Sequence, residues 1–146
     1  MNNRLYIPSV DLTPRGASAG FEIDFVWMLC RHHGRRGKSA IILGECKDQF
    51  KGINQVDIDN LRRTAAALPD RHFSVCVLLA KLGQFTPEEV ALARTLNGEH
   101  ESRVIMLTAR ELDPYHIFER TGKEFDINEY AVSPEDMAAV TAKIYF

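Results

Sequence analysis

The stretch that most constrains the fold of this chain runs from Phe21 to Lys47, where two strand-like runs flank a basic turn. The odd-numbered residues of the first run are all apolar: Phe21, Ile23, Phe25 and Trp27. A side-chain period of two then sends Asp24 to the opposite face of that strand. The second run, residues 40–47, ends in Glu45-Cys46-Lys47. The pattern predicts a β-hairpin that carries charged side chains on one face.

The register of this hairpin decides which charges meet. If the hairpin folds symmetrically about residues 34 and 35, Asp24 lies opposite Glu45, and Glu22 lies opposite Lys47 as a partner or a supporting acid. Directly opposed residues have Cβ atoms about 4.5–5.5 Å apart, and like charges there are destabilising. A sequence that keeps this pair predicts a cation between the two carboxylates. A register shift of two residues would instead give Asp24 and Lys47 an ordinary salt bridge.

Length and charge narrow the class of protein. The 146 residues are 45% hydrophobic, which predicts a single domain over 1–146 with a real core. The net charge of −2 excludes a general nucleic-acid coat, so a polyanion would have to be met locally. Basic and histidine residues do gather in the turn: Arg31, His32, His33, Arg35, Arg36 and Lys38. This turn would either clamp a phosphate backbone or be a solvated turn.

The cysteines and the apolar runs exclude other classes. Cys30, Cys46 and Cys76 have no CxxC spacing, so neither a disulfide framework nor a thiolate zinc site is indicated. The side chain of Cys46 is expected on the other face of its strand, as a small buried hydrophobe. The longest wholly apolar run, residues 75–80, is too short to span a bilayer, and the N-terminus has no apolar signal region. We expect a cytoplasmic protein with no membrane partner.

Helices and strands alternate along the rest of the chain. Thr86-Pro87-Glu88-Glu89 has the N-cap, the proline and the N3 glutamate of a helix start. The other expected elements are an edge strand around 5–7, a helix over 55–68, a buried strand over 74–80, a helix to about 97, a strand over 103–107, a short helix from 108 and a final helix capped by Ser133. Strands separated by helices imply right-handed crossovers and partly parallel pairing. The fold class is therefore α/β with a mixed sheet.

An aspartate on one strand, a Glu-x-Lys on the next and a following helix that begins near a glutamine resemble the PD-(D/E)XK, or restriction-endonuclease-like, nuclease superfamily. The resemblance covers roughly residues 21–107. It implies a restriction-endonuclease-like mixed β-sheet flanked by helices. It also implies a metal-dependent nuclease that hydrolyses phosphodiester bonds of nucleic acid, with DNA favoured over RNA.

The resemblance assigns roles to particular residues. It makes Asp24, Glu45 and the carbonyl of Cys46 the ligands of Mg²⁺ or Mn²⁺, and Lys47 the residue that positions or activates the attacking water. Gln55 resembles an accessory glutamine of some branches. The chemistry is sound, because Mg²⁺ prefers oxygen ligands, polarises phosphoryl groups and lowers the pKa of bound water. A neighbouring lysine can orient hydroxide or neutralise developing charge.

The sequence also departs from the family pattern. Ile23 replaces the proline expected before the aspartate, and residues 1–20 encode no helix ahead of the hairpin. Either that helix lies in a longer parent protein with other fused domains, or the fold is trimmed. One alternative is an inactive nuclease-like module that binds nucleic acid or a protein. Another is an unrelated α/β domain with ordinary surface ion pairs. A duplex cutter needs two sites, so a homodimer stays open, as does endonuclease against exonuclease action.

Overall fold

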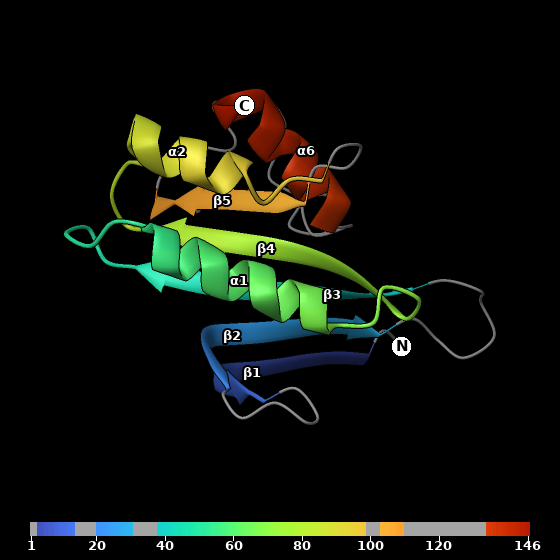
Figure 1. Ribbon diagram of the computed structural model, residues 1–146. Helices are drawn as coiled ribbons and strands as arrows, with labels where there is room; N and C mark the ends of the chain where they lie inside the picture. The colour runs from blue at the N-terminus through green and yellow to red at the C-terminus, as the bar shows by residue number, and fades with distance from the viewer. Residues whose placement is uncertain (1–2, 14–19, 31–37, 99–102, 110–133) are drawn as a thin grey trace.

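The computed structural model describes residues 3–13, 20–30, 38–98, 103–109 and 134–146, which form one mixed sheet with helices on both faces (Figure 1). The elements are β1 (Asn3–Leu12), β2 (Phe21–Cys30), β3 (Ser39–Lys47), α1 (Gln55–Ala67), β4 (Phe73–Lys81), α2 (Pro87–Arg94), β5 (Val104–Thr108) and α6 (Pro134–Tyr145). The strand order is β1-β2-β3-β4-β5. The predicted α/β class with a mixed sheet is confirmed.

The pairing of the strands divides the sheet into two halves. β1, β2 and β3 pair antiparallel, whereas β3, β4 and β5 pair parallel. In the hairpin, Phe25 pairs with Gly44 and Leu29 pairs with Ala40, which is the register predicted from symmetry about residues 34 and 35. β4 lies between two neighbours and is buried on both faces from Val75 to Leu79, as expected for a strand with a continuous apolar run.

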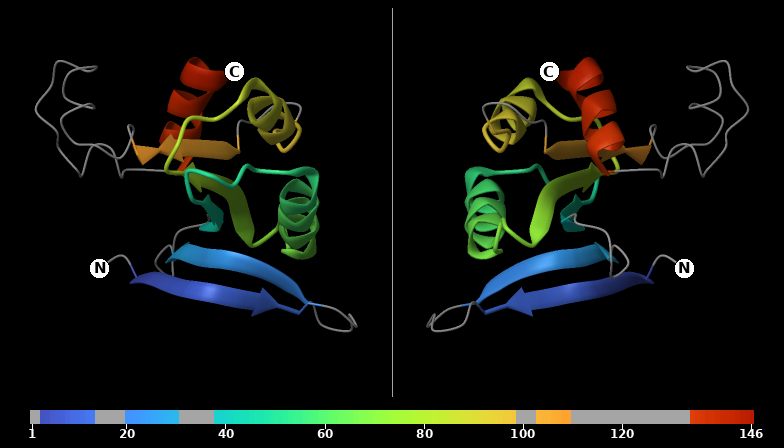
Figure 2. Two further views of the ribbon diagram at one scale, coloured as in Figure 1. Left: turned by 90° about the vertical axis from the view of Figure 1, so that its left-hand side faces the viewer. Right: turned by 90° about the vertical axis from the view of Figure 1, so that its right-hand side faces the viewer.

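The core has two layers, one on each face of the sheet. α1 and α2 cover one face and α6 covers the other (Figure 2). Alternate residues of β3 serve the two layers: Ile41 and Leu43 pack with Leu61 of α1, and Ile42 packs in the layer that contains Ala138 of α6. β1 is an edge strand, where Pro8 does not break an inner ladder.

One sequence expectation about β2 is wrong. Ile23 was expected to share a face with Phe25 and Trp27, but it belongs to the α1-side core together with Val26. Phe25 and Trp27 pack in the α6-side core instead. The ladder between β2 and β3 ends at Phe25, and Figure 1 shows β2 curving near its start. Because both faces of the sheet are covered by helices, apolar side chains on either face of a strand can pack in a core. A bend in the strand can therefore change which residues face which core.

The helix starts follow their capping signals. Thr86 and Glu89 form the predicted capping box of α2, and α6 begins at Pro134 as predicted. α1 begins at Gln55 with a second capping box, in which Asn54 accepts from the N–H of Asp57. The expected short helix after Thr108 and the basic turn over 31–37 lie outside the described residues. No helix in the described part of the chain has the length and apolar character needed to cross a bilayer.

Candidate active site

Gly44 leaves room for the ring of Phe25 on the neighbouring strand. A Cβ atom at Gly44 would lie 2.0 Å from Cε1 and Cζ of Phe25, its cross-strand neighbour. The ring of Tyr6 lies 5.8 Å from that of Phe25, so the two aromatic rings pack against each other over the glycine. Glycine inside a strand commonly marks such a close approach. The ladder stops at this pair, immediately before the acidic residues.

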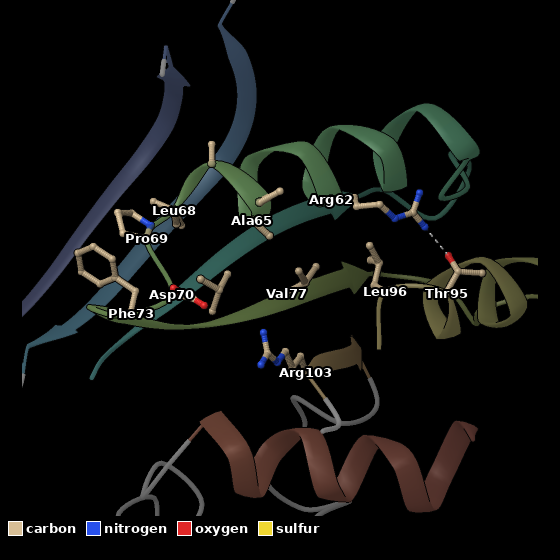
Figure 3. Close-up of a pocket in the computed structure, with 13 residues that line it drawn as sticks. Arg62, Ala65, Leu68, Pro69, Asp70, Phe73, Val77, Thr95, Leu96 and Arg103 are labelled. Atoms are coloured by element: carbon tan, nitrogen blue, oxygen red, sulfur yellow. Dashed lines mark hydrogen bonds between the residues drawn. The ribbon is translucent and has the colours of Figure 1, made fainter. Parts of the chain in front are cut away.

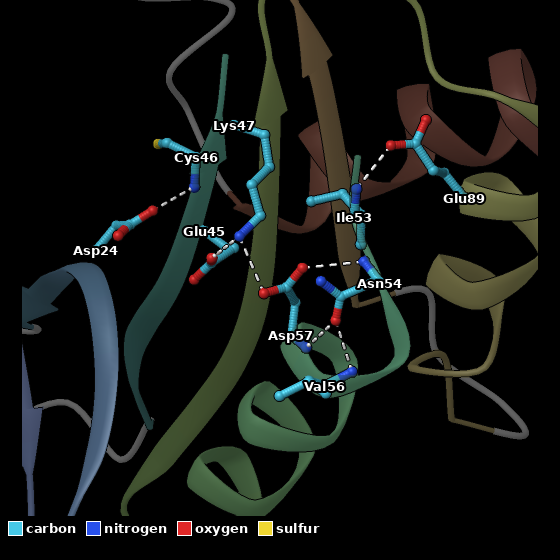
Figure 4. A network of polar contacts seen from close by, with 9 residues as sticks. All are labelled: Asp24, Glu45, Cys46, Lys47, Ile53, Asn54, Val56, Asp57 and Glu89. Atoms are coloured by element: carbon cyan, nitrogen blue, oxygen red, sulfur yellow. Dashed lines mark hydrogen bonds and ion pairs between the residues drawn. The ribbon is translucent and has the colours of Figure 1, made fainter. Parts of the chain in front are cut away.

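Asp24 connects the two strands beyond the end of their ladder. Its Oδ2 accepts a hydrogen bond of 2.6 Å from the backbone N–H of Cys46 (Figure 4). A carboxylate takes the place that a backbone carbonyl would have in a continued ladder, and its charge strengthens the bond. The bond holds the carboxyl group of Asp24 next to β3, close enough for its charge to act on Glu45.

Glu45 and Lys47 share one face of β3 and meet Asp57 from α1. Nζ of Lys47 donates to Oε1 of Glu45 at 2.6 Å and to Oδ1 of Asp57 at 3.0 Å. The other oxygen of Asp57 accepts from the backbone N–H of Asn54 at 2.9 Å, which completes the capping box (Figure 4). The start of α1 and the end of β3 are therefore joined through one lysine.

Asp57 was not among the residues assigned from the sequence. Its signal was present, because Asn54-Gln55-Val56-Asp57 has the spacing of a capping box at the predicted helix start. Such a motif normally indicates only a helix terminus. The contact with Lys47 depends on the angle at which α1 crosses the sheet, which the sequence does not encode locally.

The charges of the site perturb one another. Burial raises the pKa of Glu45, the hydrogen bond from Lys47 opposes this effect, and the charge of Asp24 raises the pKa further. Burial alone would lower the pKa of Lys47, but its bonds to Glu45 and Asp57 outweigh burial, so its pKa is raised. Lys47 is thus a firmly held ammonium group, while Glu45 is less stable as a carboxylate than an exposed glutamate would be.

The oxygen atoms of the site fit a divalent cation. The hydrogen bonds found among the described residues use Oδ2 of Asp24 and Oε1 of Glu45, and leave Oδ1 and Oε2 as further acceptors. A cation would relieve the repulsion that raises the pKa of Glu45. Two carboxylates and a backbone carbonyl are oxygen ligands of the kind that Mg²⁺ prefers. The described ranges contain no group of three or more His, Cys, Asp or Glu side chains suited to a metal.

Gln55 and Glu22, which the sequence also pointed to, lie outside this network. Gln55 is exposed at the start of α1, and its amide donates to Asp59 at 2.9 Å. Glu22 is exposed and pairs in register with Asp11 of β1, whereas Lys47 uses Glu45 and Asp57. The expectation that Cys46 is buried is wrong. Its side chain is exposed, because β3 extends past its buried section before it reaches Cys46.

A buried ion pair supports the loop in front of α1. Oε1 of Glu89 accepts from the N–H of Ile53 at 2.7 Å, and both of its oxygens lie 2.9 Å from Nζ of Lys81. The side chains of Lys81 and Glu89 are only 8% and 5% exposed. Burial alone would raise the pKa of Glu89, but the N–H groups of Thr86 and Ile53 and the ammonium of Lys81 lower it. Glu89 thereby fixes Ile53, next to the N-cap of α1.

A cavity of about 550 Å³ lies away from these charges (Figure 3). It is lined by the second half of α1, the beginning of β4 and the residues that follow α2, with Arg62 and Arg103 among its polar residues. Asp24, Glu45 and Lys47 do not line it. We therefore place the candidate active site at the carboxyl end of β3, on chemical grounds.

Comparisons with known proteins add little to this description. No protein-family model matches the chain, and no curated protein matches it. Among solved structures, the chain is similar to part of the MspJI restriction endonuclease in complex with a 27-mer oligonucleotide, with 14% sequence identity and a TM-score of 0.42. The overlap covers 97% of this chain and 28% of that protein. At this level of similarity the candidate site rests on its own geometry.

Proposed function

We propose that this chain is a metal-dependent nuclease that hydrolyses phosphodiester bonds of nucleic acid, DNA rather than RNA. The proposal is supported by two contacts where β2 and β3 part: Asp24 accepts from the N–H of Cys46, and Lys47, the next residue, donates to Glu45. These are the residues through which the sequence resembles the PD-(D/E)XK superfamily. The preference for DNA rests on the frequency of DNA substrates in that family.

The residues divide into two roles in this proposal. Asp24, Glu45 and the carbonyl of Cys46 would hold Mg²⁺ or Mn²⁺. Such an ion, when bound, polarises the phosphoryl group and lowers the pKa of its water. The ammonium of Lys47 lies next to Glu45 and would neutralise negative charge that develops on the phosphate, or orient the attacking water.

Asp57 gives Lys47 a second anchor. A cation bound by Glu45 would compete with Lys47 for the same carboxylate, since both are positive. The bond to Asp57 would then keep the ammonium beside the site. Asp57 is itself fixed by the backbone of Asn54, so this anchor has a defined position. We therefore assign Asp57 as the positioning residue of Lys47.

Cleavage assays with matched variants test the proposal. The wild-type protein should cut plasmid or oligonucleotide DNA in Mg²⁺ or Mn²⁺ and should be inactive in a chelator. Glu45→Ala and Lys47→Ala should each reduce the cleavage rate by about 10²- to 10³-fold, the range for removing one electrostatic stabiliser. Glu88→Gln, an exposed acid on α2, serves as the control and should keep full activity.

Two results would point elsewhere. Binding of nucleic acid without cleavage at any metal concentration would favour the inactive module, in which Lys47 only joins Glu45 and Asp57. Absence of both binding and metal affinity would leave an α/β domain of another kind, with these charges as structural pairs.

A further inference from the structure

Three large apolar side chains are exposed on segments that adjoin the residues of the candidate active site. Phe50 is 86% exposed, Val56 66% and Leu82 63%. Val56 precedes Asp57 in the first turn of α1, and Leu82 directly follows β4. Phe50 comes three residues after Lys47. Phe50 is the most exposed of the three.

The turn that carries Phe50 has a fixed backbone. Oδ1 of Asp48 accepts from the N–H of Phe50 at 2.7 Å and from the N–H of Lys51 at 2.8 Å. The neighbouring loop packs beside it, since the N–H of Leu82 donates to the carbonyl of Lys47 at 3.3 Å. The ring of Phe50 therefore projects into solvent from an anchored base, next to the exposed Lys51.

The position of the ring relates it to the reacting phosphate. Three residues span at most about 10 Å, so Phe50 lies within that distance of Lys47 along the backbone. Successive bases of one strand of a duplex are about 3.4 Å apart, so the ring is within a few nucleotides of the site. Aromatic rings bind bases by stacking on their faces, and the faces inside a duplex are already covered by neighbouring bases.

We propose that Phe50 stacks on an unpaired base of the strand that enters the candidate active site, and that Lys51 contacts the adjoining phosphate. This inference rests on the proposed function and extends it, because it names single-stranded or locally unpaired nucleic acid as the substrate. A positive side chain beside the ring and continuity with the site favour a polyanion over an apolar protein surface as the occupant.

The test compares a strand with bases to a strand without them. Fluorescence anisotropy measures the binding of two labelled strands in Ca²⁺. One is an oligothymidine of about 12 nucleotides, within the usual site size, and the other is an abasic strand of equal length. Phe50→Ala should weaken binding of oligothymidine by about 5- to 150-fold, the loss of one stacked base, and leave binding of the abasic strand unchanged. Phe50→Trp, which keeps an aromatic ring at this position, should bind oligothymidine as the wild type does. Ile7→Ala, which removes an exposed apolar side chain from β1, should have no effect.

The outcomes separate this inference from the nuclease proposal. Equal losses for both strands in Phe50→Ala, no loss for either, or no detectable binding by the wild type would overturn the stacking role. A dimer in sedimentation that Phe50→Ala converts to monomer would place the ring in a contact between copies and also overturn it. Base-dependent binding together with no cleavage in any metal would retain the stacking role and refute the nuclease.

Discussion

Gly44 leaves the space that the ring of Phe25 needs between the strands that carry the two carboxylates. The ring of Phe25 occupies the space where a side chain at this position would lie. The next residue is Glu45, so a displacement of β3 here would be passed directly to the site. The sequence contained a signal, since a glycine in an apolar strand suggests close approach, but it did not identify the neighbour.

Gly44→Ala should therefore impair both folding and the site. Forcing a methyl group into this contact should reduce the free energy of unfolding by about 1–3 kcal/mol, as for other overpacked sites. Urea unfolding measures the effect. Gly83→Ala is the matched control, because a Cβ atom there would lie at an ordinary 3.5 Å from the carbonyl of Gln49. Its change should stay within about 0.5 kcal/mol. Equal stability of the two variants would contradict the packing argument.

Glu45 should cost stability when no metal is present. Its raised pKa means that this residue contributes stability below its ordinary pKa of 4.5, and that the contribution is lost as the pH rises through the higher folded value. Glu45→Gln removes the charge and the repulsion from Asp24. In a chelator the variant should melt at a higher temperature than wild type at neutral pH, and the difference should disappear below pH 4.5. A lower melting temperature at neutral pH would show that the bond to Lys47 dominates.

The secondary structure elements were the most predictable part of the chain. The capping signal at Thr86 predicted the start of α2, and symmetry about residues 34 and 35 predicted the register of the hairpin. The bend in β2 was not predictable, because the strand has apolar residues of both parities, such as Ile23 and Val26, and either kind can face a core. The buried pair of Lys81 and Glu89 was also missed, since it joins elements that are brought together only by the fold.

Glu89 should be the acid on which the folding of this region depends most. Removing one partner of a buried ion pair leaves an uncompensated charge, so Glu89→Ala should cost about 3–5 kcal/mol of unfolding free energy. Glu88→Ala, its exposed neighbour in the same turn, should cost less than about 1 kcal/mol. Chemical denaturation measures both. A similar small loss in both variants would contradict the role of the pair.

The pH dependence of the same residue provides a second measurement. The pKa of Glu89 is lowered, so its stabilising contribution is complete above the ordinary value of 4.5 and is lost as the pH falls through the lower folded value. Unfolding free energy of the wild type should therefore fall on acidification below pH 4.5. The Glu89→Ala variant should show a shallower decline over that range.

At the scale of the whole molecule, the candidate site lies at the boundary between the antiparallel and parallel halves of the sheet. β3 belongs to both halves and carries Glu45 and Lys47 at its end. The alternation of strands and helices predicted a mixed sheet, and the spacing of Glu45 and Lys47 predicted that they share a face of β3. The crossing of α1 over the sheet, which supplies Asp57, required the assembled fold.

Binding of a divalent ion should stabilise the entire domain. A ligand that binds only the folded state adds about 2.7 kcal/mol when its concentration is 100 times its dissociation constant. Mg²⁺ or Mn²⁺ should therefore raise the melting temperature of the wild type, and adding a chelator should reverse the effect. Glu45→Gln should not respond, because it lacks one of the proposed ligands. An equal response of both proteins would place the ion elsewhere.

The bond from the Cys46 amide to Asp24 has a consequence for how such a site would be loaded. The carboxylate of Asp24 accepts a hydrogen bond that joins the two strands, and it would also be a ligand of the cation. The hydrogen bond and the cation would therefore compete for the negative charge of one group. A bound ion would weaken the hydrogen bond from the Cys46 amide to Asp24. The amide proton of Cys46 would then exchange with solvent at a rate that depends on whether the ion is bound. Hydrogen exchange at this one amide between β2 and β3 would thus report whether the ion is present.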